Sequence, residues 1–178
     1  MSERISLPKA MAIGVVCLLL SEILCLFIAF TFAALSSSFF LAKPCSVLCT
    51  TAIHVGLMID YASKMAKRDH LQEHCFREPH QTARPLFLAL AVAAPLLLLW
   101  LGLLACKLFD LGNFLPAYRL LNAHFFQAIF YITGDVKLSD LSFLRLGCCA
   151  LTCLVPAITV FAAYLYKYRN CASLEVTL

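Results

Sequence analysis

Three long stretches without a charged residue constrain this chain more than any other feature. They cover Ile23–Ala42, Pro85–Cys106 and Leu146–Tyr166, which are 20, 22 and 21 residues long. A helix needs about 20 apolar residues to cross the ~30 Å hydrocarbon core of a bilayer. Apolar residues make up 62% of the chain and charged residues only 13%, whereas soluble domains contain roughly 45–50% and 25%. The sequence therefore predicts an all-helical integral membrane protein.

Four transmembrane helices are expected, forming a single membrane domain over residues 1–178. The first follows a basic start and is about twice as long as the 7–15-residue apolar core of a signal peptide, so it is expected to be an uncleaved signal anchor. The second contains His54 and has the shortest charge-free run, Pro44–Ile59. The four expected spans are residues 10–40, 44–61, 85–109 and 141–166.

The remaining segments are short and polar. We expect a cytosolic loop over residues 63–84, an outer segment over 110–140 and a cytosolic tail over 167–178. Within the outer segment, Phe114–Thr133 is apolar but interrupted by Arg119, Asn122, His124 and Gln127. That pattern predicts an additional interfacial helix between the third and fourth spans, lying on the membrane or over the mouth of the bundle.

The distribution of Lys and Arg predicts the orientation. With four spans and an inner N-terminus, nine of these residues lie on the inner side and five on the outer side. Positive charge favours the cytosolic side, so both termini are expected to be cytosolic. Cysteine usage favours a eukaryotic secretory-pathway or plasma membrane.

Glu22 is the most informative ionisable residue, because a carboxylate inside a membrane must be protonated, paired or exposed to water. His54 on the next helix is its candidate partner, and the two form a candidate intramembrane polar pair. One interpretation is proton or ion coupling. The other is that Glu22 simply makes hydrogen bonds between helices.

No catalytic residue, cofactor site or metal site is predicted. The segment His70–His74 matches the H-x-x-E-H pattern, in which two histidines bind zinc and a glutamate acts as a base. Here it lies in a short expected loop with no soluble domain to supply a cleft and a third ligand. A solvated loop is the favoured interpretation, and the chain is not expected to be an enzyme.

The cysteines and the C-terminal residues suggest three further features. Cys171 lies close to the end of the last span and is a candidate for S-palmitoylation. The terminal residues Val176, Thr177 and Leu178 are a candidate PDZ-type ligand, because such an end adds as a strand to a groove. The outer ends of the spans hold the candidates for disulfides, with ordinary packing as the alternative: Cys45, Cys49, Cys106, Cys148, Cys149 and Cys153.

Four spans with short loops are typical of tetraspan-type proteins in general. The outer loop lacks the cysteine pattern of tetraspanins, and the first loop is too short for claudins. The expected partners are the lipid bilayer and other membrane proteins or further copies of the chain, and no nucleic acid. The favoured function is an accessory subunit, trafficking adaptor or membrane organiser acting through protein–protein contacts. The alternatives are a small oligomeric transporter or channel subunit that uses Glu22 and His54, and a membrane-embedded enzyme.

Overall fold

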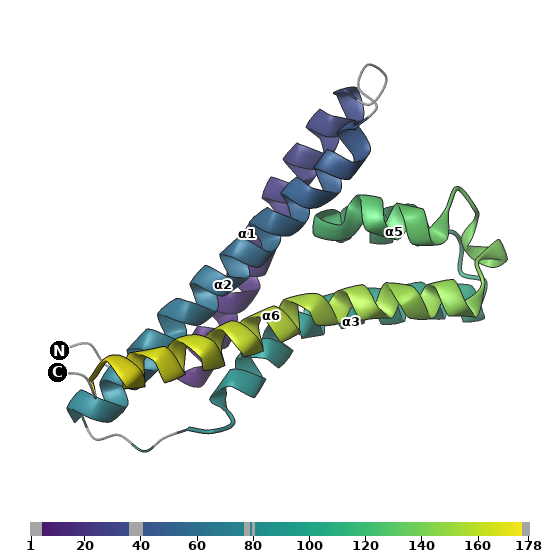
Figure 1. Cartoon of the computed structure of the whole chain (residues 1–178). Coiled ribbons are helices and arrows are strands. Elements are labelled where there is room, and N and C mark those ends of the chain that lie inside the picture. The colour runs from purple at the N-terminus through teal and green to yellow at the C-terminus, as the bar shows by residue number, and fades with distance from the viewer. Residues whose placement is uncertain (1–4, 36–40, 77–78, 80, 176–178) are drawn as a thin grey trace.

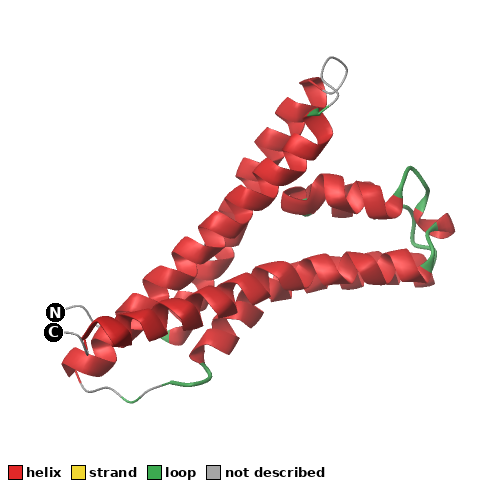
Figure 2. Cartoon of the chain, in the orientation of Figure 1, coloured by secondary structure: helices red, strands yellow, loops and turns green. Residues whose placement is uncertain are grey.

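The computed structural model describes residues 5–35, 41–76, 79 and 81–175 of the chain, with side chains as far as Cys171. Within these ranges every regular element is a helix and no strand is present (Figure 2). Four helices are long and apolar enough to cross a membrane, as the sequence predicts. They are α1 (Leu7–Leu35), α2 (Ala42–Phe76), α3 (Arg84–Leu108) and α6 (Phe143–Glu175).

Helix α2 differs most from its expected bounds. It does not end near Tyr61 but continues to Phe76, so most of the segment expected to be a loop over residues 63–84 is helical. The extension is stable because its inner face is covered by the other helices: Met65, Ala66, Asp69 and His70 are all buried.

The expected interfacial helix over Phe114–Thr133 is broken into shorter pieces. They are α4 (Leu115–Leu121), the 3₁₀ turn η1 (Ala123–Phe125) and α5 (Phe126–Thr133), followed by a second 3₁₀ turn, η2 (Leu138–Asp140). Asn122 leaves the helical conformation at φ −117° and ψ 54°, which separates α4 from η1. Helix α5 ends at Gly134, whose φ of 65° suits a residue without a Cβ atom.

The long helices form two pairs that cross and then diverge. Helices α1 and α2 run side by side in one pair, and α3 and α6 in the other (Figure 1). The pairs meet where α1 begins and α6 ends, so these two chain ends lie at the same end of the bundle. At the opposite end the pairs spread apart, and α5 lies between them.

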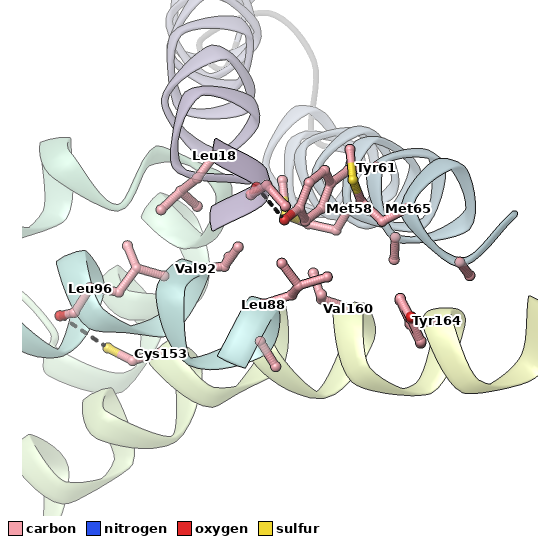
Figure 3. Packing of buried hydrophobic residues seen from close by; sticks show 14 residues of the cluster. Leu18, Met58, Tyr61, Met65, Leu88, Val92, Leu96, Cys153, Val160 and Tyr164 are labelled. Atoms are coloured by element: carbon pink, nitrogen blue, oxygen red, sulfur yellow. Dashed lines mark hydrogen bonds between the residues drawn. The ribbon is translucent and has the colours of Figure 1, made fainter. Parts of the chain in front are cut away.

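The main hydrophobic core lies where the two pairs cross (Figure 3). Leu18 of α1 and Met58 of α2 are buried there against Leu88 and Val92 of α3. The α1–α2 contact is close at Gly14, where a Cβ atom would lie 2.7 Å from the Tyr61 hydroxyl oxygen. That hydroxyl donates a 2.8 Å hydrogen bond to the carbonyl oxygen of Ala10.

A second core attaches α4 and α5 to the other pair. Tyr118 of α4 is fully buried among Leu103 of α3, Ile129 of α5 and Leu146 of α6. Its hydroxyl donates a 3.3 Å hydrogen bond to the carbonyl oxygen of Cys149. The α4–α5 segment is therefore packed into the bundle and forms part of its core.

The outward faces of the long helices are apolar. Phe27 of α1, Leu48 of α2, Leu98 of α3 and Ile158 of α6 are each 64–70% exposed. A soluble monomer rarely exposes large contiguous apolar surface. These faces match a hydrocarbon environment.

Candidate metal centre

Three ionisable side chains from three different elements meet inside the bundle. Glu22 comes from α1, His54 from α2 and His124 from η1. Each offers one potential ligand atom, and these atoms all lie within 4.8 Å of one another. The residues are 8%, 0% and 1% exposed. This is the strongest concentration of metal-ligating chemistry among the described residues.

Helical periodicity explains why two of these side chains point inward. Glu22 follows Leu18 by four residues and shares its buried face on α1. His54 lies four residues before Met58 on the buried face of α2. His124 enters from the side, because the break at Asn122 directs the η1 turn toward α1 and α2.

The partner of His54 determines which ring nitrogen is free. Ser21 Oγ donates a 2.8 Å hydrogen bond to the carbonyl oxygen of Leu18 and lies 2.8 Å from His54 Nδ1. Since the single hydroxyl proton is already used, Ser21 Oγ accepts a hydrogen bond from a protonated His54 Nδ1. In the neutral imidazole, His54 Nε2 then carries the lone pair, and this buried atom has no hydrogen-bond partner.

Glu22 and His124 contact each other directly. Glu22 Oε1 contacts His124 Nδ1 directly, and Glu22 Oε2 accepts a 3.3 Å hydrogen bond from the backbone N–H of His124. The rings of His54 and His124 are stacked, with centroids 4.0 Å apart and planes inclined by 19°. Phe125 packs against His124 at a centroid distance of 4.6 Å.

The unsatisfied nitrogen atoms point to a ligand. His54 Nε2 and His124 Nε2 are both buried without a hydrogen-bond partner. Leaving a buried polar atom unpaired costs about 1–3 kcal/mol, so native proteins rarely do so without a functional reason. Two such atoms beside a carboxylate are a donor set that a cation would satisfy.

Two histidines and one glutamate match the chemistry of zinc. Zn²⁺ binds imidazole nitrogen and carboxylate oxygen at about 2.0–2.2 Å, and a tetrahedral site requires ligand atoms about 3.3 Å apart. The three ligand atoms lie within 4.8 Å of one another, and Glu22 already contacts His124, so the spacings must adjust to form that geometry. The nearly parallel rings must also turn, because their lone pairs do not converge on one point while the rings are stacked. Rotation of the His124 ring away from the stack is the simplest change.

The sequence identifies two of the three residues. Glu22 and His54 are predicted as a pair, and the structure places them in one cluster without a direct hydrogen bond between them. Sequence analysis missed His124 as their common neighbour, since it lies in a segment expected at the membrane surface. The available signal was a histidine within an apolar run that is too polar to form a simple span.

The H-x-x-E-H residues belong to helix α2 and make packing contacts. The rings of His70 and His74 lie 4.3 Å apart, and the edge of His70 meets the ring of Tyr168 on α6 at 5.3 Å. Glu73 accepts a hydrogen bond from the Tyr168 hydroxyl. The expectation of a solvated loop is therefore corrected: this part of the chain packs against α6.

A buried ion pair next to these residues joins the helix ends. Arg84 Nε lies 2.7 Å from Asp69 Oδ2, and both side chains are 2% exposed. Asp69 also accepts a 2.7 Å hydrogen bond from Tyr164 of α6, and Arg84 donates one of 2.7 Å to the carbonyl oxygen of Ile5 before α1. This network ties all four long helices together at the end where α1 begins.

The other predicted positions are not brought into a site. All ten cysteines lie within the described residues and are free thiols, so no pair among the six disulfide candidates is bridged in the structure. Cys149 and Cys153 are fully buried in the cores. Cys171 is half-buried in the last turns of α6. The PDZ-type tail, Val176 to Leu178, lies outside the described residues. Bridging, palmitoylation and tail binding stay predictions.

Comparison with known proteins gives no relative: no family model, curated protein or solved structure matches the chain.

Proposed function

We propose that this chain is a small multi-pass membrane protein that binds a zinc-class divalent metal ion within the bilayer and passes it across the membrane as a transporter or channel subunit. Glu22, His54 and His124 are the proposed ligands. The observation that carries the proposal is the buried meeting of one carboxylate and two imidazoles with unpartnered Nε2 atoms.

Membrane insertion is supported by the four long apolar helices and their exposed apolar faces. The proposal that both termini lie on one side is supported by the arrangement of the helices, since α1 begins and α6 ends at the same end of the bundle (Figure 1). The excess of Lys and Arg at that end favours the cytosol.

An exchangeable ion is favoured over a permanently held one. Structural zinc sites have four protein ligands, whereas this cluster has three and would leave a position open for water or an incoming anion. The third ligand lies on a three-residue turn between two short helices, so it can move without bending a long helix. One carboxylate removes half of the ion's charge, which lowers the cost of holding the ion away from water.

The function expected first from the sequence, an accessory or adaptor role through protein–protein contacts, stays a prediction, and no described contact favours it over metal binding. The expectation that the chain is not an enzyme also stays a prediction.

The direct test is zinc binding by purified protein in detergent, measured by calorimetry against a competing chelator. We expect one site per chain, with binding lost in Glu22→Gln, His54→Gln and His124→Gln. His74→Gln is the matched control, because His74 is an exposed histidine outside the cluster. If the three cluster variants bound zinc as tightly as the His74→Gln control, the site would be refuted.

Transport is tested separately in sealed vesicles that contain a zinc-sensitive dye. The wild-type protein should increase zinc entry above that of protein-free vesicles, and Glu22→Gln should abolish the increase. Zinc binding without any flux would retain the site and reject the transport function.

A further inference from the structure

A cavity lies away from the Glu22–His54–His124 cluster, at the end of the bundle where the helix pairs diverge. It has a volume of about 320 Å³ and lies between the ends of α1 and α2 and the segment α4–α5. Its lining combines three aromatic rings with two cationic side chains and an amide: Phe32, Phe126, Phe130, Lys43, Arg119 and Gln127. We call this cavity the α4–α5 pocket.

Arg119 is the unusual member of this lining. The side chain is only 9% exposed, and no described carboxylate forms an ion pair with it. Its Nη2 donates hydrogen bonds to Thr133 Oγ1 at 2.6 Å and to the carbonyl oxygen of Gly134, both of which are neutral. Its Nε is buried without a partner. Among the described residues, this buried guanidinium has only neutral hydrogen-bond partners and no carboxylate in direct contact, and burying a charge is costly without such a partner.

An aromatic ring holds the guanidinium in place, and the guanidinium stays charged although it is buried. It lies over the ring of Phe130, with the guanidinium carbon 4.9 Å from the ring centroid. Burial lowers the pKa of Arg119 below its ordinary value, and the nearby charge of Asp135 opposes this change. Arginine remains protonated in proteins, so the pocket contains a fixed positive charge.

Lys43 adds a second positive charge from another element. It lies at the start of α2, is exposed and lines the same cavity as Arg119. The aromatic side chains Phe32, Phe126 and Phe130 also line the cavity. The pocket therefore has a cationic part and an apolar part, as a ligand with an anionic head and a hydrocarbon tail requires.

We propose that the α4–α5 pocket binds an anionic phospholipid, with the phosphate contacted by Arg119 and Lys43 and the upper acyl chain by Phe32, Phe126 and Phe130. Arginine is well suited to phosphate, because its parallel N–H groups match the oxygen spacing. Basic pockets between membrane helices on the cytoplasmic or matrix side hold anionic headgroups, and the α4–α5 pocket offers the same chemistry at the end of the bundle opposite the start of α1 and the end of α6. A bound lipid would fix α5 against the end of the α1–α2 pair, close to the turn that carries His124.

The experiment is a lipid titration of the full chain in neutral detergent, read by native mass spectrometry. The probes are phosphatidylglycerol, phosphatidylcholine with the same acyl chains, and inorganic phosphate alone. We expect one phosphatidylglycerol bound about tenfold or more tightly than phosphatidylcholine, because two cations favour a net negative headgroup. Inorganic phosphate should not displace it, since it lacks the hydrocarbon tail.

Matched variants assign the effect to the pocket. Lys43→Gln combined with Arg119→Gln should remove the preference for phosphatidylglycerol. Lys137→Gln combined with Arg145→Gln removes two exposed cations elsewhere in the segment after α5 and should retain the preference. Lys43→Gln alone should weaken it severalfold, and it tests the pocket without disturbing the buried Arg119 contacts.

Three results would overturn the proposal. Equal binding of the two lipids by the wild-type protein would remove the need for a cationic site. Equal loss of the preference in both double variants would reduce the effect to general surface charge. Displacement of the lipid by inorganic phosphate would identify a simple anion site in place of a lipid site. None of these results depends on whether the Glu22–His54–His124 cluster binds zinc.

Discussion

The buried ion pair between Asp69 and Arg84 should contribute far more to stability than an exposed pair of the same length. The two side chains are 2% exposed and 2.7 Å apart. Asp60 and Lys64 on α2 form a pair at 2.6 Å whose side chains are 57% and 68% exposed. The two pairs therefore differ in burial while their distances are nearly the same.

Replacing Arg84 with Met leaves the Asp69 carboxylate buried without its cation and removes the hydrogen bond to Ile5. Breaking a buried pair in this way costs about 3–5 kcal/mol. The variant carrying both Asp69→Asn and Arg84→Met should be less destabilised than the sum of its single variants, with a coupling energy of about 2–3 kcal/mol. For Asp60→Asn and Lys64→Met the coupling should be only about 0.3–0.5 kcal/mol, because water screens the exposed pair.

The assay is reversible unfolding of the purified protein by sodium dodecyl sulfate in mixed micelles, followed by circular dichroism. A double-mutant cycle at each pair isolates its coupling energy from other losses. Similar coupling energies at the two pairs would refute the reasoning, because burial would then have no effect. A value near zero at Asp69–Arg84 would mean that the helix ends are not joined as described.

Three further predictions concern single positions. Ser21→Ala should weaken zinc binding by about 10–100-fold in the same calorimetric assay, because it removes the partner that orients the His54 ring; an unchanged affinity would exclude this role. Gly14→Ala should destabilise the protein by about 1–3 kcal/mol through overpacking against Tyr61, whereas Gly56→Ala, where a Cβ meets no atom within 4 Å, should be close to neutral in the same unfolding experiment. With a water-soluble maleimide and no reductant, Cys75 should react in the folded protein because it is exposed. The fully buried thiols of Cys25, Cys149 and Cys153 should react only after unfolding. A buried thiol that reacts as fast as Cys75 would contradict the packing described here.

The sequence predicts the long apolar helices well, because a charge-free run of 20 residues has few other folds available. It fails at the end of α2, where charged residues after Ile59 suggest a membrane boundary. There, Asp69 is buried because Arg84, 15 positions later in the chain, returns to pair with it. That compensation depends on tertiary contact and leaves no local pattern.

The candidate site is also predictable only in part, because some of its residues stand out locally and one is placed by tertiary contacts. Glu22 is conspicuous because it is the only charge in its apolar stretch, and His54 because it lies in the next one. His124 stands out only as a histidine in an apolar run, and its place beside Glu22 and His54 is not predictable, since it depends on the break at Asn122 that turns η1 back toward α1 and α2. Periodicity describes which face of a helix a residue occupies, but a broken helix has no single face.

The central claim, that Glu22, His54 and His124 form a metal site, is tested most directly by X-ray absorption at the zinc edge of the loaded protein. The account predicts only nitrogen and oxygen neighbours at about 2.0–2.2 Å, with the multiple-scattering signature of two imidazoles. His124→Gln, which should not hold zinc, should show no imidazole scattering after the same loading. A sulfur neighbour at about 2.3 Å, or a fully hydrated ion without imidazole, would place the metal elsewhere and contradict the claim.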